Sequence, residues 1–239
     1  MESTASTIVL IFVLAFLAFF VFRGHRKGFL RAALTTFSFV IVIALSTAFT
    51  TPVSNFLENT FVGNKVENSV SDFVESKVED FIGEDGGSIS ESEEDTFLES
   101  LPLPSFIQNN LKTSNTLEEY AQLQVESFEE YTTAKFTEII ISAIAYVLVM
   151  VIAWILIRLI LKFAGFINKI PIIGGLNRFL GALLGFLEGL LILWALGLVI
   201  IAFSSTSFGS AAVETIQSNA LLDFIFDNNL LVVMFGMLF

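Results

Sequence analysis

The 239-residue sequence contains no cysteine and a single histidine, His25. Without cysteine the chain can form no disulfide, and it offers neither a thiolate nucleophile nor a thiolate metal ligand. With one histidine it cannot build a multi-histidine metal site on its own. The HExxH, GxSxG, P-loop and dinucleotide-binding motifs are also absent. We therefore expect no enzymatic activity, no cofactor and no metal.

Charged residues are scarce as well. They make up 15% of the chain, whereas hydrophobic residues make up 54%, phenylalanine alone contributes 27 residues, and the mean hydropathy is +0.79. Soluble domains are usually about 45–50% apolar, and a chain of this length could not bury the remaining apolar surface in one core. The composition predicts an integral membrane protein.

Most of the acidic residues are concentrated in one segment. Residues 51–138 hold 19 acidic and 4 basic residues, a net charge of −15, whereas the rest holds 5 acidic and 8 basic residues. An acidic segment between two mildly basic membrane parts gives no basic surface for nucleic acid, so we expect no nucleic-acid partner.

Four apolar stretches predict membrane-spanning helices at about 6–22, 29–50, 138–161 and 179–203, each within or near the spanning range of about 17–25 residues. The first is an uncleaved helix rather than a signal peptide, because its bases follow the apolar core and no small-residue cleavage site is present. The expected fold class is all-α: a polytopic membrane protein with two transmembrane hairpins, 1–50 and 138–203, and a helical insertion between helices 2 and 3.

Two basic loops predict the orientation. The first is a turn with two glycines between the first two helices, made of Arg23, Gly24, Arg26, Lys27, Gly28 and Arg31. The second carries Arg158, Lys162, Lys169 and Arg178. Cytoplasmic loops are enriched in Lys and Arg. The N-terminus, the acidic region and the C-terminus are therefore expected outside a cytoplasmic or inner membrane.

The acidic region 51–137 has its own helical signals. Apolar residues recur with helical spacing between Val62 and Ile82. The segment 83–100 is rich in acid, Gly and Ser and is expected to be a mobile loop. Thr116 and Glu119 fit a capping box. The helix that starts there is expected to run without a break into the third span.

The end of the chain, 204–239, is expected to be amphipathic. Asp223 and Asp227 share one helical face, and the last apolar run has only about ten residues, which is too few to cross a bilayer. An interfacial or re-entrant segment is favoured over a fifth span.

The fourth span combines a glycine repeat with a buried acid. Gly181, Gly185 and Gly189 recur every four residues and lie on one helical face. Such a face permits close helix packing, within the bundle or between copies of the chain, or it could line a pore. Glu188 lies beside them and is expected to form an ion pair with Arg158 or Lys162, to couple protonation to transport, or to lie closer to water than its position indicates.

The stretch from Ile170 to Leu191, IPIIGGLNRFLGALLGFLEGLL, resembles the hallmark of the colicin V production protein (CvpA) family. In that family a Pro and a Gly precede an Asn-Arg pair, and glycines four apart open the last membrane helix. The resemblance implies that Pro171, Gly174, Asn177, Arg178, Gly181, Gly185 and Gly189 are motif positions, and that the Arg23–Arg31 turn is the family's first cytoplasmic loop. It also implies a membrane protein linked to bacteriocin production and envelope homeostasis, and it brings no catalytic residue.

Two functions follow as hypotheses. In the first, the chain is a non-enzymatic scaffold that acts in toxin biosynthesis or envelope homeostasis through an envelope protein bound by residues 51–137. In the second, it is a small oligomeric transporter or channel that uses Glu188 and the glycine face. Membrane lipid is an expected partner in both, and a homo-oligomer is an alternative assembly.

Overall fold

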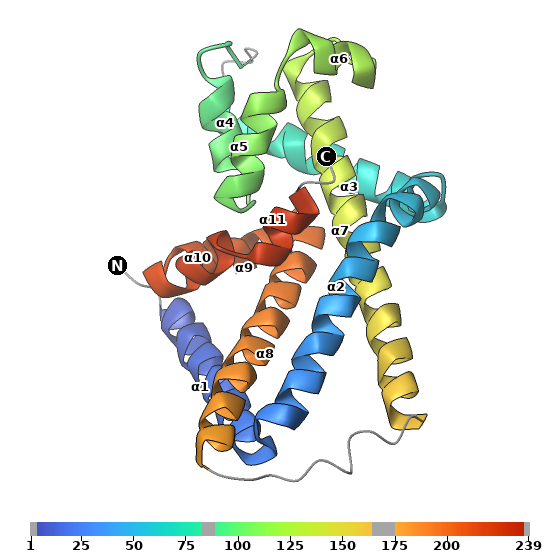
Figure 1. Cartoon of the computed structure of the whole chain (residues 1–239). Helices are drawn as coiled ribbons and strands as arrows, with labels where there is room; N and C mark the ends of the chain where they lie inside the picture. The colour runs from blue at the N-terminus through green and yellow to red at the C-terminus, as the bar shows by residue number, and fades with distance from the viewer. Residues whose placement is uncertain (1–3, 83–88, 164–174, 237–239) are drawn as a thin grey trace.

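Four long helices form the body of the molecule (Figure 1). The structure is a computed structural model, and it describes residues 4–82, 89–163 and 175–236, in which every regular element is an α-helix. The long helices are α1 (Thr4–Lys27), α2 (Phe29–Glu58), α7 (Phe128–Phe163) and α8 (Gly175–Ala202). Among the described residues, these four alone are long and apolar enough to cross a membrane. The predicted all-helical fold with four candidate spans is confirmed.

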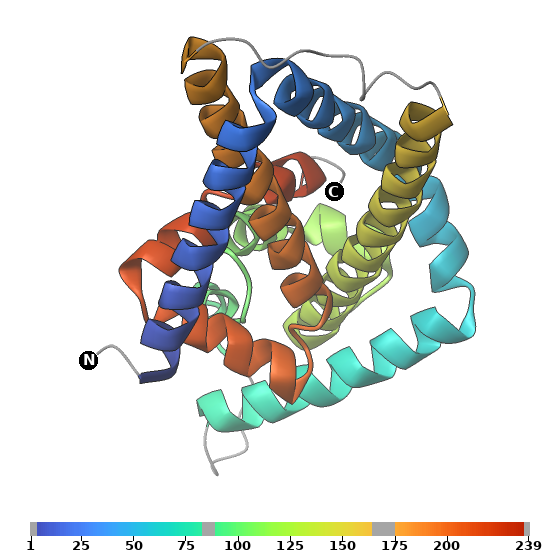
Figure 2. The same cartoon turned by 90° about the horizontal axis from the view of Figure 1, so that it is seen from below.

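The long helices pack mainly with helices distant in the sequence. The most extensive contacts of α1 are with α8, and those of α2 are with α7. Figure 2 shows α1 lying along α8, with α2 and α7 on the other side of the bundle. Helix α8 also contacts α2 and α7, so it joins the two pairs. The fold is therefore held together across the sequence hairpins.

All four helices are longer than the spans that the apolar pattern predicted, α7 and α2 by the most. Helix α2 continues past Pro52 to Glu58, although a proline removes one helical hydrogen bond. Its continuation is packed: Leu57 is buried with Ile141 and Ala145 of α7. Helix α7 begins at Phe128 rather than near residue 138, and its polar first turns contact the acidic region.

Short helices form a layer at one end of the four long ones. Helix α3 (Phe61–Ile82) lies across the ends of the long helices in Figure 1, and α4 (Glu94–Ser100), α5 (Ser105–Ser114) and α6 (Leu117–Leu123) complete the layer. Val70 and Val74 from α3 and Phe97 and Leu98 from α4 are fully buried in the main core. The acidic region therefore has a packed apolar core that continues into the bundle.

Two expectations for this layer are wrong. Residues 94–100 of the predicted mobile loop form α4, because Phe97 and Leu98 supply it with a buried face; residues 83–88 lie outside the described residues. The helix from Leu117 does not run into the third span. It ends at Leu123 because the next residue, Gln124, has a left-handed φ of 58°, and the Val125 amide donates to the Tyr120 carbonyl. The capping box is present, since the Thr116 hydroxyl accepts from the Glu119 amide.

The C-terminal part forms three short helices, α9 (Ser207–Gln217), α10 (Ala220–Asp227) and α11 (Leu230–Gly236). At about 1.5 Å per residue none of them can cross a bilayer. Two hydrogen bonds tie them to α8: Trp194 Nε1 donates to the Ile225 carbonyl (3.1 Å), and Asn229 Nδ2 donates to the Trp194 carbonyl (2.9 Å). Asp227 in turn accepts from the Ser105 amide and hydroxyl at the start of α5. The C-terminal helices therefore connect α8 with the acidic layer.

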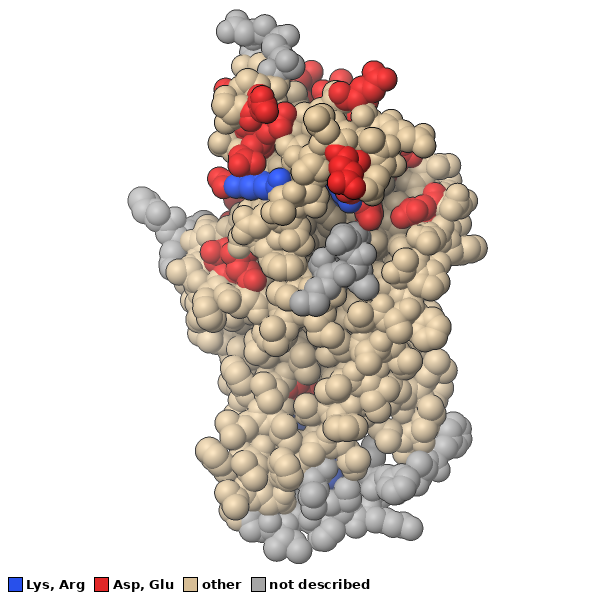
Figure 3. Space-filling model, turned by 45° about the horizontal axis from the view of Figure 1, so that its top comes forward, with Lys and Arg blue, Asp and Glu red and all other residues tan. Residues whose placement is uncertain are grey.

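Charge separates along the molecule. Figure 3 shows Asp and Glu gathered over the short-helix layer, above a broad uncharged belt. Outside residues 51–138 all eight basic residues fall between Arg23 and Arg31 or between Arg158 and Arg178. The described members of both groups lie at the opposite end of the bundle, where α1 and α7 end and α2 and α8 begin (Figure 1).

Candidate functional site around Glu188

The backbones of α1 and α8 come very close at their glycines. A Cβ added to Gly185 would lie 2.3 Å from the Phe20 carbonyl oxygen, and one added to Gly181 would lie 2.5 Å from the Gly24 carbonyl oxygen. A Cβ on Gly24 would in turn lie 2.2 Å from the Gly181 carbonyl oxygen. All of these neighbours are backbone atoms, which cannot move aside as a side chain can. Only glycine fits at these three positions.

The approach of α8 explains why the basic turn differs from expectation. Gly24 was expected to help form a turn, but α1 continues to Lys27, and Gly24 lies inside the helix where α8 crosses it. The turn is made by Gly28 alone, whose φ of 73° is readily available to glycine. The bases that were predicted to lie in a loop therefore project from helix ends, with Arg23, Arg26 and Lys27 in the last turns of α1.

Glu188 is buried in this contact. Its side chain is 3% exposed. Arg23 Nη1 lies 3.4 Å from its Oε1, and Lys27 Nζ lies 3.9 Å from its Oε2. The predicted pairing with Arg158 or Lys162 is wrong. Because α8 packs on α1, the acid faces two α1 bases that are one helical turn apart.

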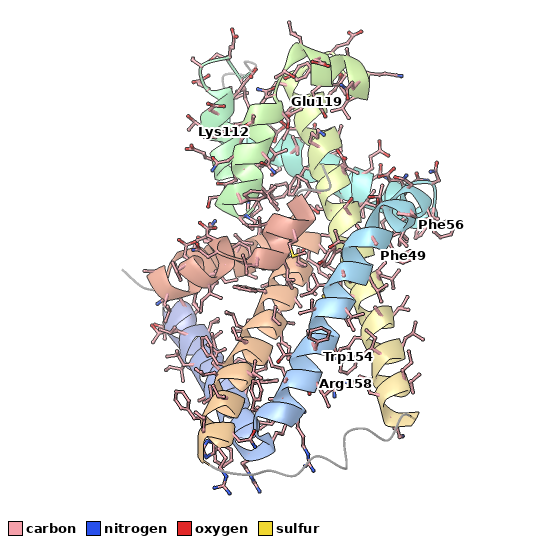
Figure 4. All side chains as sticks on the ribbon, viewed as in Figure 1. Phe49, Phe56, Lys112, Glu119, Trp154 and Arg158 are labelled. Carbon is pink, nitrogen blue, oxygen red and sulfur yellow. The ribbon has the colours of Figure 1, made fainter. Side chains whose placement is uncertain are left out.

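The two bases predicted as partners of Glu188 have other surroundings. Arg158 lies over the ring of Trp154, with its guanidinium carbon 5.2 Å from the ring centroid. Figure 4 shows both side chains on α7, in the space between α7 and α2. Lys162 is exposed one turn further along α7.

Asn177 has a role that sequence reasoning missed. Its Oδ1 accepts a hydrogen bond of 2.9 Å from the Phe29 amide, the first N–H of α2. Helix termini leave their first amides without partners, and the residue at the N-cap position here is Gly28, which has no side chain to accept them. Asn177 thus caps α2 from another helix and links α8 to the Gly28 turn.

None of the remaining predicted site residues that the structure describes forms an ion pair with Glu188. Arg178 is exposed. Arg26 lies over the ring of Phe22 at 5.7 Å, and Arg31 is half-buried in the first turn of α2. A Cβ on Gly189 would meet the Phe20 side chain at 3.0 Å. Pro171 and Gly174 lie outside the described residues.

No cluster of His, Cys, Asp and Glu in the described parts of the chain could hold a metal ion. Chemically, the site offers one buried carboxylate, two bases that neutralise it, and a close backbone contact. Such a site can lock two helices together at a membrane surface. The i, i+4 spacing of Arg23 and Lys27 is visible in the sequence. The sequence does not show that α1 is the helix that packs on α8, and the pairing with Glu188 was missed for that reason.

Comparison with known families assigns the α8 part of this site. The family model described as colicin V production protein matches residues 118–228, which run from α6 through α7 and α8 into the C-terminal helices. This region belongs to the colicin V production protein family. The match includes Asn177, Glu188 and the three α8 glycines, whereas α1 with its bases lies outside it. No curated protein matches the chain, and no solved structure matches it.

Proposed function

We propose that this colicin V production family member is a non-enzymatic inner-membrane protein that acts in bacteriocin production or envelope homeostasis by binding a protein partner. The family description supports the link to bacteriocin production. The four membrane-type helices support the location. The observation that carries the partner-binding part is the acidic short-helix layer, a packed surface at one end of the bundle.

The orientation we propose puts the basic end in the cytoplasm, and the N-terminus, the acidic layer and the C-terminus outside. It is supported by the two basic groups lying at one end, as the positive-inside rule requires. Cysteine labelling tests it, because the chain has no other cysteine. Ser76→Cys on α3 and His25→Cys on α1 are both at exposed positions. We expect an impermeant reagent added outside to label only Ser76→Cys, and the reverse pattern overturns the orientation.

The exposed acids of α3 are the best candidates for partner contacts. Asp72, Glu75 and Glu79 are all exposed. They lie on the helix that crosses the ends of the long ones, so a basic partner could reach them without entering the membrane. Charge complementarity of this kind speeds association and selects partners.

The test neutralises this face. The variant Asp72→Asn/Glu75→Gln/Glu79→Gln should reduce bacteriocin output from producing cells while its level in the membrane stays at the wild-type value. A matched control changes three exposed apolar residues of the belt, Phe12→Leu, Phe19→Leu and Phe37→Leu, and should leave output unchanged. Wild-type output from the neutralised variant would overturn the proposed contact surface.

A transporter or channel built on the glycine face is less well supported, because α1 of the same chain covers that face. We infer that the glycines serve packing within one chain rather than a pore. Proteoliposome flux with wild-type protein and with Glu188→Gln distinguishes the two. Flux that disappears in Glu188→Gln would favour transport, and the scaffold proposal expects none in either.

A further inference from the structure

A lateral groove of about 680 Å³ lies between the four long helices near their basic end. Residues from α1, α2, α7 and α8 line it. The surface of its wall is apolar, with Met150, Val151 and Trp154 from α7 and Ile192 from α8. Trp154 and Val151 are 41% and 48% exposed, so the groove is open along α7. Because these helices are candidate spans, the groove opens towards the hydrocarbon of the bilayer.

The basic end of the groove carries more positive than negative charge. Arg23, Arg158 and Glu188 line it, and Lys27 adjoins Glu188. The single carboxylate is paired with Arg23 and Lys27. None of the ion pairs between described residues involves Arg158, which instead repels Lys27 electrostatically. Three cations around one carboxylate leave a site that favours an anion.

An apolar groove that ends in uncompensated cations matches an amphiphile with an anionic head. We propose that the groove binds one anionic phospholipid, with its phosphate near Arg158 and Arg23 and an acyl chain along Val151, Trp154 and Ile192. The Arg158 guanidinium, held over the Trp154 ring 5.2 Å from its centroid, stands where the apolar wall ends. A guanidinium binds phosphate oxygens through several fixed N–H donors. In a zwitterionic head the positive group partly neutralises the charge of that phosphate. The groove is therefore selective for net negative lipid.

The chain supplies its own reporter for this proposal. It has two tryptophans. Trp154 lines the groove, whereas Trp194 lines a separate pocket beside the C-terminal helices, to which it is hydrogen-bonded. Trp194→Phe leaves Trp154 as the only tryptophan, and Trp154→Phe leaves Trp194. Each variant is reconstituted in vesicles of phosphatidylcholine that contain a rising fraction of brominated phosphatidylglycerol or brominated phosphatidylcholine, and bromine quenches tryptophan on contact.

We expect Trp154 to be quenched at about a fivefold lower fraction of brominated phosphatidylglycerol than of brominated phosphatidylcholine. That ratio corresponds to about 1 kcal/mol, the contribution of one base near a membrane surface. Trp194 should respond equally to both lipids. Equal quenching of Trp154 by the two lipids, or the same preference at Trp194, would overturn the proposal.

Arg158→Gln and Lys162→Gln make a matched pair. Both remove one positive charge near the end of α7, but only Arg158 lines the groove. Arg158→Gln should abolish the lipid preference of Trp154, and Lys162→Gln should keep it. Equal loss in both would mean general surface attraction and would contradict a built site. Native mass spectrometry of the chain with both tryptophans intact repeats the comparison by counting bound phosphatidylglycerol. It remains decisive if Trp194→Phe fails to fold.

Discussion

The two ends of the molecule are stabilised in different ways. At the basic end, α1 and α8 meet backbone to backbone through glycines, and one buried carboxylate forms ion pairs with two bases. At the acidic end, aromatic and aliphatic side chains fill the space between short helices, and side chains such as Asp227 and Thr116 cap them. The first contact tolerates almost no added atoms, and the second distributes its stability over many side chains. Substitutions at the basic end should therefore have the larger single effects.

The largest effect should come from Gly185→Leu. The new Cβ would stand 2.3 Å from the Phe20 carbonyl oxygen, so α1 and α8 must separate and the chain should fail to fold or assemble. Membrane level and size-exclusion behaviour in detergent measure this. Gly175→Leu is the control, because an added Cβ there meets nothing within 4 Å. Equal behaviour of the two variants would contradict the close contact.

Removing the buried carboxylate should have the next largest effect. Glu188→Ala leaves Arg23 and Lys27 without their counter-charge. We expect the free energy of unfolding to fall by about 2 kcal/mol, which is less than for a fully buried pair because both bases are partly exposed. Thermal unfolding in detergent measures it.

The partner of Glu188 is identified by a charge swap. Glu188→Arg combined with Arg23→Glu should recover part of the stability that either single change loses. Glu188→Arg combined with Arg158→Glu should recover none. Rescue by the Arg158 swap alone would contradict the observed pair.

Much of this comparison was visible in the sequence. The four spans, the concentration of acid in residues 51–138 and the two basic groups predicted an all-helical membrane protein with chemically opposite ends. The glycines marked a close contact on α8. These properties depend on composition and local periodicity, which each segment carries on its own.

The sequence could not predict which helix lies against which. Glu188 was assigned to the bases of α7 because neighbouring spans usually pack together, but α8 lies on α1, so its partners are Arg23 and Lys27. The same crossing makes Gly24 a packing residue and leaves the turn to Gly28. The break at Gln124 was also hidden, because no glycine or proline marks it and a left-handed glutamine costs about 1–2 kcal/mol that tertiary contacts must offset.

A smaller effect is expected at the cap between α8 and α2. Asn177→Ala removes the acceptor of the Phe29 amide and should cost about 1 kcal/mol, the usual value for losing a helix cap. Asn177→Asp keeps an acceptor oxygen and should stay near the wild type. Unfolding midpoints of the two variants in detergent give the comparison. An equal loss of stability in both would mean that the hydrogen bond to the Phe29 amide is not its cause.

The smallest effect should appear at the acidic end and depend on pH. Burial, and then the Asp227 carboxylate, raise the pKa of the Asp223 carboxyl above its ordinary value of 3.8. The charged form is therefore disfavoured in the fold, so Asp223 costs stability at neutral pH. That cost falls as the pH drops through the raised pKa and vanishes below the ordinary one.

Asp223→Asn should accordingly raise stability at pH 7 by about a few tenths of a kcal/mol, a small value because the group is partly solvated. It should match the wild type only well below the ordinary pKa of 3.8, where the carboxyl is protonated in the folded and unfolded states alike. Melting temperatures across this pH range test the trend, with the exposed Asp72→Asn as the control. A gain that grows as the pH falls would have the wrong sign for a raised pKa.

The most direct test of the account joins α1 to α8 within one chain. A Cβ on Gly189 would lie 3.0 Å from the Phe20 Cβ, somewhat closer than the separation of about 3.5–4.5 Å in disulfides, so a small shift of the helices brings the pair into range. In this cysteine-free chain, Phe20→Cys with Gly189→Cys should oxidise to a monomer with an internal disulfide, whereas Phe20→Cys with the lipid-facing Leu187→Cys should not. Disulfide-linked dimers from the first pair, with no internal bond, would contradict the packing of α1 on α8 of the same chain.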